Sequence, residues 1–201
     1  MKEVPLKLEG FNDNIFAGFG TRLASLLLDM LILMPLVLVI LYLNSANLHA
    51  YYYTLIPNLL INLFYNVYLP KKYGGTPGKL IMGIQIIKLN GEPIGWKESF
   101  LRHLIVFLLT IYVSIVTISA ISQADEATFE SLSWLQQSQY ITSLLPILFA
   151  VFTWLNNIWT WGELIVLLTN ARKRAVHDYI AGTVIVKKIY LEKIRHEINT
   201  K

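Results

Sequence analysis

Gly20-Thr-Arg-Leu-Ala-Ser-Leu-Leu-Leu-Asp-Met-Leu-Ile-Leu-Met-Pro-Leu-Val-Leu-Val-Ile-Leu-Tyr-Leu43 is a long apolar run with one acid, Asp29, in its interior. A helix that enters hydrocarbon near Phe19 places Asp29 about 15 Å deep in a bilayer core of about 30 Å. An ionised carboxylate at that depth costs about 2.5 to 3.5 kcal/mol on insertion scales. Asp29 is therefore expected to be neutral, paired or facing a polar cavity, and it is a candidate functional residue.

The remaining apolar runs predict further membrane helices. The chain has 201 residues, of which 55% are hydrophobic. About 20 apolar residues in helical conformation cross a bilayer core. The sequence thus predicts an all-α integral membrane helical bundle of about four transmembrane helices, with a break in the last one near Pro146 or Gly162 as one alternative. The predicted spans cover residues 18–43, 51–69, 100–121 and 142–169.

The basic residues predict the orientation of these spans. All 17 Lys and Arg lie in or next to the N-terminal segment, the connection between the second and third spans, and the C-terminal tail. Residues 44–50 are neutral, and residues 122–140 carry only acids. Because cytoplasmic connections are enriched in Lys and Arg, both termini and the middle connection are expected to be cytoplasmic. The net charge of +4 then reflects topology and contact with lipid head groups, and we expect no nucleic-acid partner.

Short segments outside the spans have their own patterns. Residues 82–89 alternate like a strand and lead into Asn90-Gly91, a dipeptide typical of tight turns, which predicts a small cytoplasmic β-hairpin. Residues 183–188 are also strand-like, so we expect a minor sheet that brings the tail against the hairpin. The external segment 122–140 is expected to form a short amphipathic helix at the membrane interface.

Two predicted spans carry a polar stripe, because positions three or four apart share one face of a helix. The stripes consist of Asn58, Asn62 and Asn66 in the second span and Asn156, Thr160 and Glu163 in the fourth. Amides bind cations or hydrogen-bond to other helices, and the second use is ordinary packing between membrane helices. Asp29 has a structural alternative as well, as a protonated or Arg-paired acid that fixes helix register. The stripes alone leave both uses open.

Several function classes are disfavoured by the sequence. There is no cysteine, and the four histidines are scattered, so neither metal ligation nor a cofactor is expected. Paired carboxylates and a nucleophile with a nearby base are missing at workable spacing, which predicts that the protein is not an enzyme. Thr76-Pro-Gly-Lys79 lacks the spacing of a phosphate-binding loop, so we also expect no nucleotide site.

Three segments resemble the RDD family of bacterial membrane proteins. They are Ala17-Gly-Phe-Gly-Thr-Arg22-Leu-Ala-Ser-Leu-Leu-Leu-Asp29, Gly75-Thr-Pro-Gly-Lys79 followed by Gly83, Gly91 and Arg102, and Arg174-Ala-Val-His-Asp-Tyr-Ile-Ala-Gly-Thr-Val-Ile-Val186. The arginine and two aspartates that name the family match Arg22, Asp29 and Asp178. The resemblance implies a single membrane domain over residues 1–188, followed by a charged cytoplasmic tail at 189–201. The acidic segment 122–140 and the long last span depart from the family pattern.

The resemblance implies a location in the bacterial cytoplasmic (inner) membrane, with multiple passes, and suggests transport. Some members are described as Na⁺ or K⁺/proton antiporters, and a eukaryotic relative as an assembly partner in a membrane complex. A desolvated carboxylate can hold either a proton or a cation, so the first hypothesis is monovalent cation/proton antiport. The alternative is a non-enzymatic scaffold or assembly protein. Membrane lipid is an expected partner in either case, and Gly20 and Ala24 permit a homodimer through close helix approach.

The antiport hypothesis assigns roles to particular residues. Asp29 is the exchanging carboxylate, and Asn58 and Asn62 supply neutral oxygens for a hard cation. Glu163 is a further candidate for ion or proton binding. The matched motif positions Arg22, Asp178, Lys79 and Arg102 are candidates for gating. In this hypothesis Arg22 tunes or gates Asp29 by pairing with Asp178, which folds back under the bundle.

Overall fold

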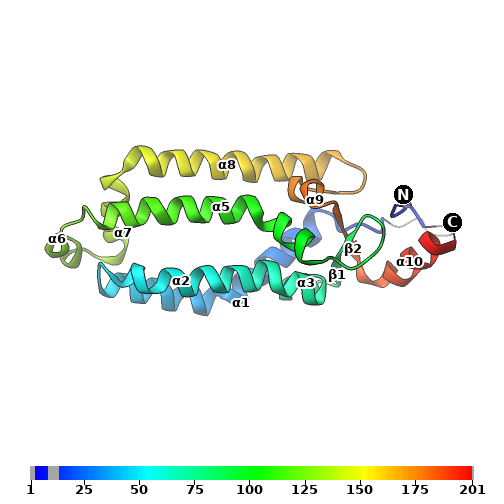
Figure 1. Ribbon diagram of the computed structural model, residues 1–201, viewed down its shortest axis with the longest axis horizontal. Helices are drawn as coiled ribbons and strands as arrows, with labels where there is room; N and C mark the ends of the chain where they lie inside the picture. The colour runs from blue at the N-terminus through cyan, green and yellow to red at the C-terminus, as the bar shows by residue number, and fades with distance from the viewer. Residues whose placement is uncertain (1–2, 9–13, 201) are drawn as a thin grey trace. The chain divides into compact units, whose positions relative to one another are not determined.

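The computed structural model describes residues 3–8 and 14–200 (Figure 1). These residues are mostly helical, with a single two-stranded sheet among them. In chain order the elements are α1 (Phe19–Ala46), α2 (Ala50–Leu63), the π-helix η1 (Phe64–Tyr68), α3 (Leu69–Tyr73), α4 (Pro77–Ile81), β1 (Ile84–Lys88), α5 (Trp96–Ile121), α6 (Glu126–Ser131), α7 (Trp134–Leu144), α8 (Pro146–Thr169), α9 (Val176–Ile180), β2 (Thr183–Lys187), the 3₁₀-helix η2 (Lys188–Tyr190) and α10 (Leu191–Thr200).

The described helices include two that are long and apolar enough to cross a membrane, α1 with 28 residues and α5 with 26. The pair α7 and α8 adds a third candidate if it is counted as one span, and it bends by 101° at a break beside Pro146. Proline lacks the N–H that would continue the hydrogen-bond ladder, which explains a break at this position. At Gly162, the other position considered, α8 continues without a break.

The predicted second span is helical but is not a single α-helix. Residues 50–73 run through α2, η1 and α3, and the π-helical turn lies at Phe64–Tyr68. A π-turn leaves a backbone group that needs another partner. The Ser99 hydroxyl, from α5, supplies one by donating to the Val67 carbonyl at 2.6 Å. Among the described residues, two helices are long and apolar enough to cross a membrane, or three if the bent pair counts as one span. The sequence predicted four spans.

The predicted sheet forms between distant segments. β1 and β2 pair in antiparallel fashion, with Ile84 opposite Lys187 and Lys88 opposite Thr183. The predicted turn at Asn90-Gly91 is present, and Gly91 has a φ of +85°, which glycine adopts without strain. The second arm of the hairpin contributes an isolated bridge, Ile87 to Pro93, where the sequence predicted a strand pair. The predicted pairing of the tail with this segment is present, since Ile87 also pairs with Val184 of β2.

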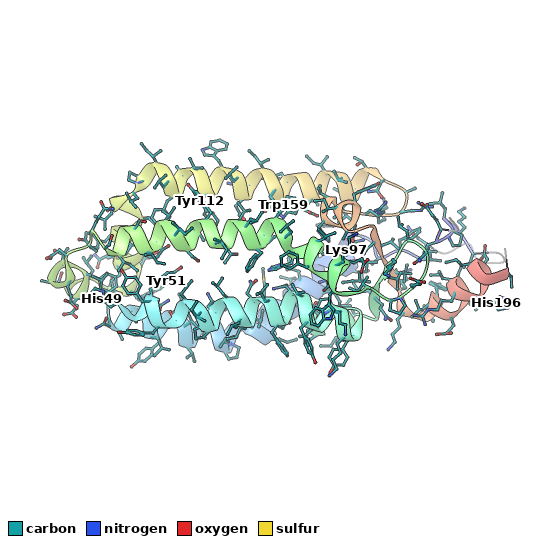
Figure 2. The ribbon with its side chains drawn as sticks, viewed as in Figure 1. His49, Tyr51, Lys97, Tyr112, Trp159 and His196 are labelled. Carbon is teal, nitrogen blue, oxygen red and sulfur yellow. The ribbon has the colours of Figure 1, made fainter. Side chains whose placement is uncertain are left out.

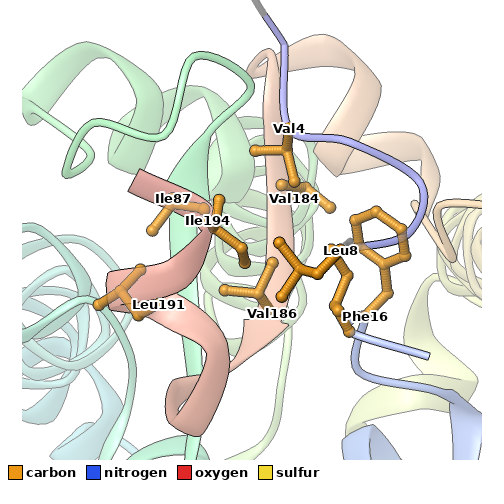
Figure 3. Close-up of a cluster of buried hydrophobic side chains, with 9 residues drawn as sticks. Val4, Leu8, Phe16, Ile87, Val184, Val186, Leu191 and Ile194 are labelled. Carbon is orange, nitrogen blue, oxygen red and sulfur yellow. The ribbon is translucent and has the colours of Figure 1, made fainter. Parts of the chain in front are cut away.

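The chain packs as two compact units. The first unit comprises Met1–Ile32, Leu63–Leu104 and Trp161–Lys201, and it contains the sheet. Figure 3 shows one hydrophobic cluster of this unit, where side chains from the N-terminal segment, both strands and α10 point toward one another. Its buried members are Val4, Leu8, Ile15, Phe16, Ile87, Val184, Val186, Leu191 and Ile194. Apart from residue 201, which lies outside the described residues, the predicted charged tail is thus largely a helix docked on the sheet.

The second unit comprises Leu33–Asn62 and Ile105–Thr160. Where the sequence predicted one short amphipathic helix in residues 122–140, the structure has two, α6 and α7 (Figure 1). The Asp125 carboxylate caps α6 by accepting a hydrogen bond from the Thr128 amide at 2.8 Å. Within this unit the Tyr112 hydroxyl, labelled in Figure 2, donates to the Leu148 carbonyl at 3.1 Å and joins α5 to α8.

Candidate functional site

Asp29 lies in the first unit and is only 7% exposed. Its Oδ1 accepts hydrogen bonds from the Tyr65 hydroxyl at 2.5 Å and from the Gly78 amide at 2.7 Å. Its Oδ2 accepts one from the Thr76 hydroxyl at 2.6 Å. Three donors from two other segments therefore converge on this carboxylate. Asp29 is a satisfied polar group, as buried acids in a membrane protein must be.

The short helix α4 approaches Asp29 with its N-terminus. Thr76 is its N-cap residue and Pro77 follows, a combination typical of helix starts. The Thr76 side chain makes no cap bond of its own. The Asp29 carboxylate, from α1, caps the helix by accepting from the Gly78 amide. A Cβ on residue 78 would collide with the Ser25 carbonyl and lie 2.7 Å from Asp29 Oδ1, so this approach requires glycine.

Lys79 supplies a cationic group next to Asp29. Its Nζ lies 4.0 Å from Asp29 Oδ2 and donates to the Thr76 hydroxyl at 3.1 Å. Burial lowers the pKa of Lys79 to about 8, and this effect outweighs the opposing influence of Asp29. Arg102 and Arg22 lower the pKa of Lys79 further through charge repulsion. Lys79 can therefore gain or lose a proton near neutral pH while it faces a buried carboxylate.

Substitution of Lys79 by methionine should change how stability depends on pH. The folded-state pKa of about 8 lies below the ordinary 10.5, so between these values the unfolded chain binds more protons. Wild-type stability should then rise with pH across this window, by up to about 3 kcal/mol at about 1.4 kcal/mol per pKa unit. The measurement is the difference in unfolding free energy between wild type and Lys79→Met at pH 7.5 and pH 10, in detergent. Parallel pH profiles for the two proteins would contradict this assignment.

Asp178, in α9, is the centre of a second polar cluster in the same unit and is fully buried. Arg22 Nη1 donates to its Oδ2 at 2.8 Å, which is the expected pair between first span and tail. Arg102 donates to its Oδ1, and the Ala175 amide donates to Oδ2 at 2.9 Å. Burial alone would raise the pKa of Asp178, but the surrounding positive charges, Arg102 first among them, hold it well below its usual range.

Further groups hold the arginines of this cluster in place. Arg22 also donates to the carbonyl of Lys173, a residue with a φ of +50°. Arg102 also donates to the Thr183 hydroxyl, at the start of β2. Arg174 Nη2 donates to the Asp178 carbonyl at 2.9 Å. The cluster therefore joins the start of α1, the first turns of α5 and the β2 region around one carboxylate.

The predicted site residues fall in both units. Asp29, Lys79, Arg22, Arg102 and Asp178 all belong to the first unit, where their charges interact. Glu163 also lies there and contacts His177, with its Oε2 2.7 Å from His177 Nδ1 and its Oε1 accepting from the His177 amide at 2.9 Å.

Asn58 and Asn62 lie in the second unit, where Asn58 is exposed and Asn62 half-buried. The hydrogen-bond donors to Asp29 are thus hydroxyl and amide groups of the first unit. The role of the two asparagines in ion binding stays a prediction.

Sequence reasoning did not find Tyr65, Thr76 or Gly78 as partners of Asp29. A tyrosine in an apolar helix carries no special signal. Thr76-Pro77 does carry one, because Thr followed by Pro predicts a helix start, and a helix start needs acceptors for its free amides. That signal indicates that a helix start in the middle connection requires a hydrogen-bond acceptor. It does not say which acceptor in the chain fills that need.

Long apolar helices and two buried acids, Asp29 and Asp178, that join α1 to other segments are the features of a helical membrane protein. A family model described as RDD family matches residues 16–182. The chain belongs to the RDD family, which confirms the resemblance of its three motifs. Comparisons with curated proteins and with solved structures gave no significant match.

Proposed function

We propose that this protein is a monovalent cation/proton antiporter and that Asp29 and Lys79 form its exchange site. The observation that supports this proposal is the grouping of a buried carboxylate, two hydroxyl oxygens and a titratable ammonium within a few ångströms. Carboxylate and neutral oxygen ligands suit hard cations such as Na⁺. In this proposal the Lys79 ammonium, 4.0 Å from Asp29 Oδ2, supplies the positive charge that a cation would replace.

Exchange follows from charge balance at Asp29. When Lys79 carries its proton, its ammonium balances the carboxylate. When Lys79 releases the proton, Asp29 keeps its negative charge, and a monovalent cation entering among the oxygens of Asp29, Tyr65 and Thr76 restores the balance. One cation enters for each proton that leaves. A pKa of about 8 allows this proton release near physiological pH.

We further propose that the chain crosses the bacterial cytoplasmic membrane four times, with both termini in the cytoplasm. The four crossings would be α1, the continuous helical segment 50–73, α5 and α8. The positive-inside pattern supports this topology, because the second unit contains no Lys or Arg among its residues. Asp29 contacts residues 76–78, which belong to a polar connection between helices. Such a connection is tolerated at membrane depth only where protein or water surrounds it, so we place the edge of the hydrocarbon core near Asp29. The 17 residues of α1 after Asp29 still rise about 25 Å.

The test is proton flux in proteoliposomes that contain the purified protein, after addition of Na⁺, K⁺, Li⁺ or choline chloride. Wild type should move protons with a metal cation and not with choline. Asp29→Asn should abolish the flux, and Lys79→Met should abolish its coupling to protons. Lys187→Met is the matched control, because it removes a lysine of the same unit outside this grouping. Undiminished flux in Asp29→Asn would overturn the proposal.

A second candidate, a scaffold or assembly protein, is favoured by a different observation. Both oxygens of Asp29 and both oxygens of Asp178 accept hydrogen bonds within the fold, as in a purely structural cluster. Such a protein would show no cation-dependent flux when folded and inserted, and it would be recovered with another membrane protein or with a second copy of itself. Chemical crosslinking in native membranes tests for such a partner.

A further inference from the structure

An apolar groove of about 430 Å³ lies in the first unit, between the helical segment 63–68 and the start of α5. Its lining residues are Leu63, Phe64, Val67, Tyr68, Trp96 and Phe100. Phe64, Trp96 and Phe100 remain 40% to 55% exposed, so the groove is open at the surface. The rings of Phe64 and Tyr68 stack along one wall at 5.1 Å, and the Trp96 ring of α5 lies tilted against Tyr68 at 6.1 Å.

Lys71 and Lys72 lie next to aromatic rings that line this groove. Lys71 Nζ lies 5.0 Å from the centre of the Trp96 ring, and Lys72 Nζ lies 5.6 Å from that of Tyr68. Cation–π contacts of this kind position an ammonium group without neutralising it. Lys97 is an exposed cation at the start of α5 (Figure 2). Glu98, the neighbouring acid, accepts a hydrogen bond from the Gly95 amide at 2.8 Å.

The order of these groups along the helices matches the shape of a lipid. On the first wall, Leu63 and Phe64 come earliest, Tyr68 follows one turn later, and the lysines come at the end of α3. On α5, Trp96 lies at the first residue and Phe100 one turn further in. Both walls therefore run from apolar side chains to an aromatic ring and then, on the first wall, to positive charge. Tryptophan, tyrosine and lysine are the residues that mark a membrane interface.

We propose that this groove is a binding site for an anionic phospholipid. The phosphate and negatively charged headgroup contact the ammonium groups of Lys71 and Lys72, and an acyl chain lies along Phe64, Trp96 and Phe100. The π-helical turn at Phe64–Tyr68 shapes the groove, and the Ser99 hydroxyl fixes that turn to α5 through the Val67 carbonyl. The proposal rests on the membrane location of the chain and does not depend on the transport activity.

The experiment counts bound lipids on the full chain in detergent by native mass spectrometry. The probes are dioleoyl phosphatidylglycerol and dioleoyl phosphatidylcholine, which share acyl chains and differ in net charge. The wild-type protein should retain the anionic lipid in preference. Replacement of both lysines, Lys71→Gln with Lys72→Gln, should weaken that binding about 25-fold, from about fivefold for each lysine. The affinity for phosphatidylcholine should change little.

The matched control is Lys187→Gln with Lys188→Gln. This pair is also adjacent in sequence, also includes a lysine over a tyrosine ring, and removes the same charge. Phe100→Ser tests the acyl contact separately and should weaken both lipids equally. Equal retention of the two lipids by wild type would overturn the proposal. An equal loss in both lysine pairs would overturn it too, since the effect would then reflect net charge alone.

Discussion

Replacing Asp178 by asparagine is expected to lower the free energy of unfolding by about 3 to 5 kcal/mol. The carboxylate is fully buried and accepts hydrogen bonds from both Arg22 and Arg102. Removing one partner from a buried ion pair leaves uncompensated charge, and this accounts for the size of the loss. Chemical unfolding in detergent measures it. Because the pKa of Asp178 is depressed, its stabilising effect is complete above the ordinary aspartate range and is lost only in strong acid.

Glu192→Gln is the control for this prediction. Glu192 pairs with Arg195 at 3.5 Å on the surface of α10, and its side chain is 87% exposed. Exposed pairs of this kind contribute little to stability. The double variant Arg22→Asp with Asp178→Arg should not regain wild-type stability, because an arginine at position 178 would face Arg102. Wild-type stability in Asp178→Asn would show that the cluster contributes nothing to the fold.

Replacing Gly78 by alanine is expected to destabilise the protein by about 2.5 to 6 kcal/mol. The new methyl group would overlap the Ser25 carbonyl and crowd Asp29 Oδ1. Helix α4 must then move away from α1, and the hydrogen bond from the residue 78 amide to Asp29 is lost. Overpacking costs about 1 to 3 kcal/mol, and a hydrogen bond to a charged group adds about 1.5 to 3. The unfolding midpoint in denaturant measures the change, and any flux activity should fall with it.

Gly162→Ala provides the matched comparison. The substitution is chemically the same and lies within α8, where a Cβ meets no atom within 4 Å. Alanine is the better helix former, so this variant should be at least as stable as wild type. Equal stabilities for Gly78→Ala and Gly162→Ala would mean that α4 does not need its close contact with α1.

Much of the architecture was accessible from sequence patterns. The apolar runs predicted α1 and α5 nearly to their ends, and the alternation in residues 82–89 and 183–188 predicted both strands. These patterns are local, because hydropathy and periodicity are properties of consecutive residues. The span at 51–69 and the one at 142–169 were predicted less well. The π-turn at Phe64–Tyr68 accepts a hydrogen bond from a hydroxyl of α5, a contact that is not local, and no local rule gives the size of the bend beside Pro146.

The candidate site, like the fold, could be predicted from the sequence only in part. Hydropathy alone showed that an acid lies within the first apolar helix and that it needs a partner, since hydrocarbon cannot solvate a carboxylate. The groups that contact this acid became known from the three-dimensional fold. Thr76 and Gly78 lie 47 and 49 residues from Asp29, and Asp178 lies 156 residues from Arg22. Such partners are chosen by the path of the folded chain, because a hydrogen bond requires two groups within about 3 Å whatever their separation in sequence.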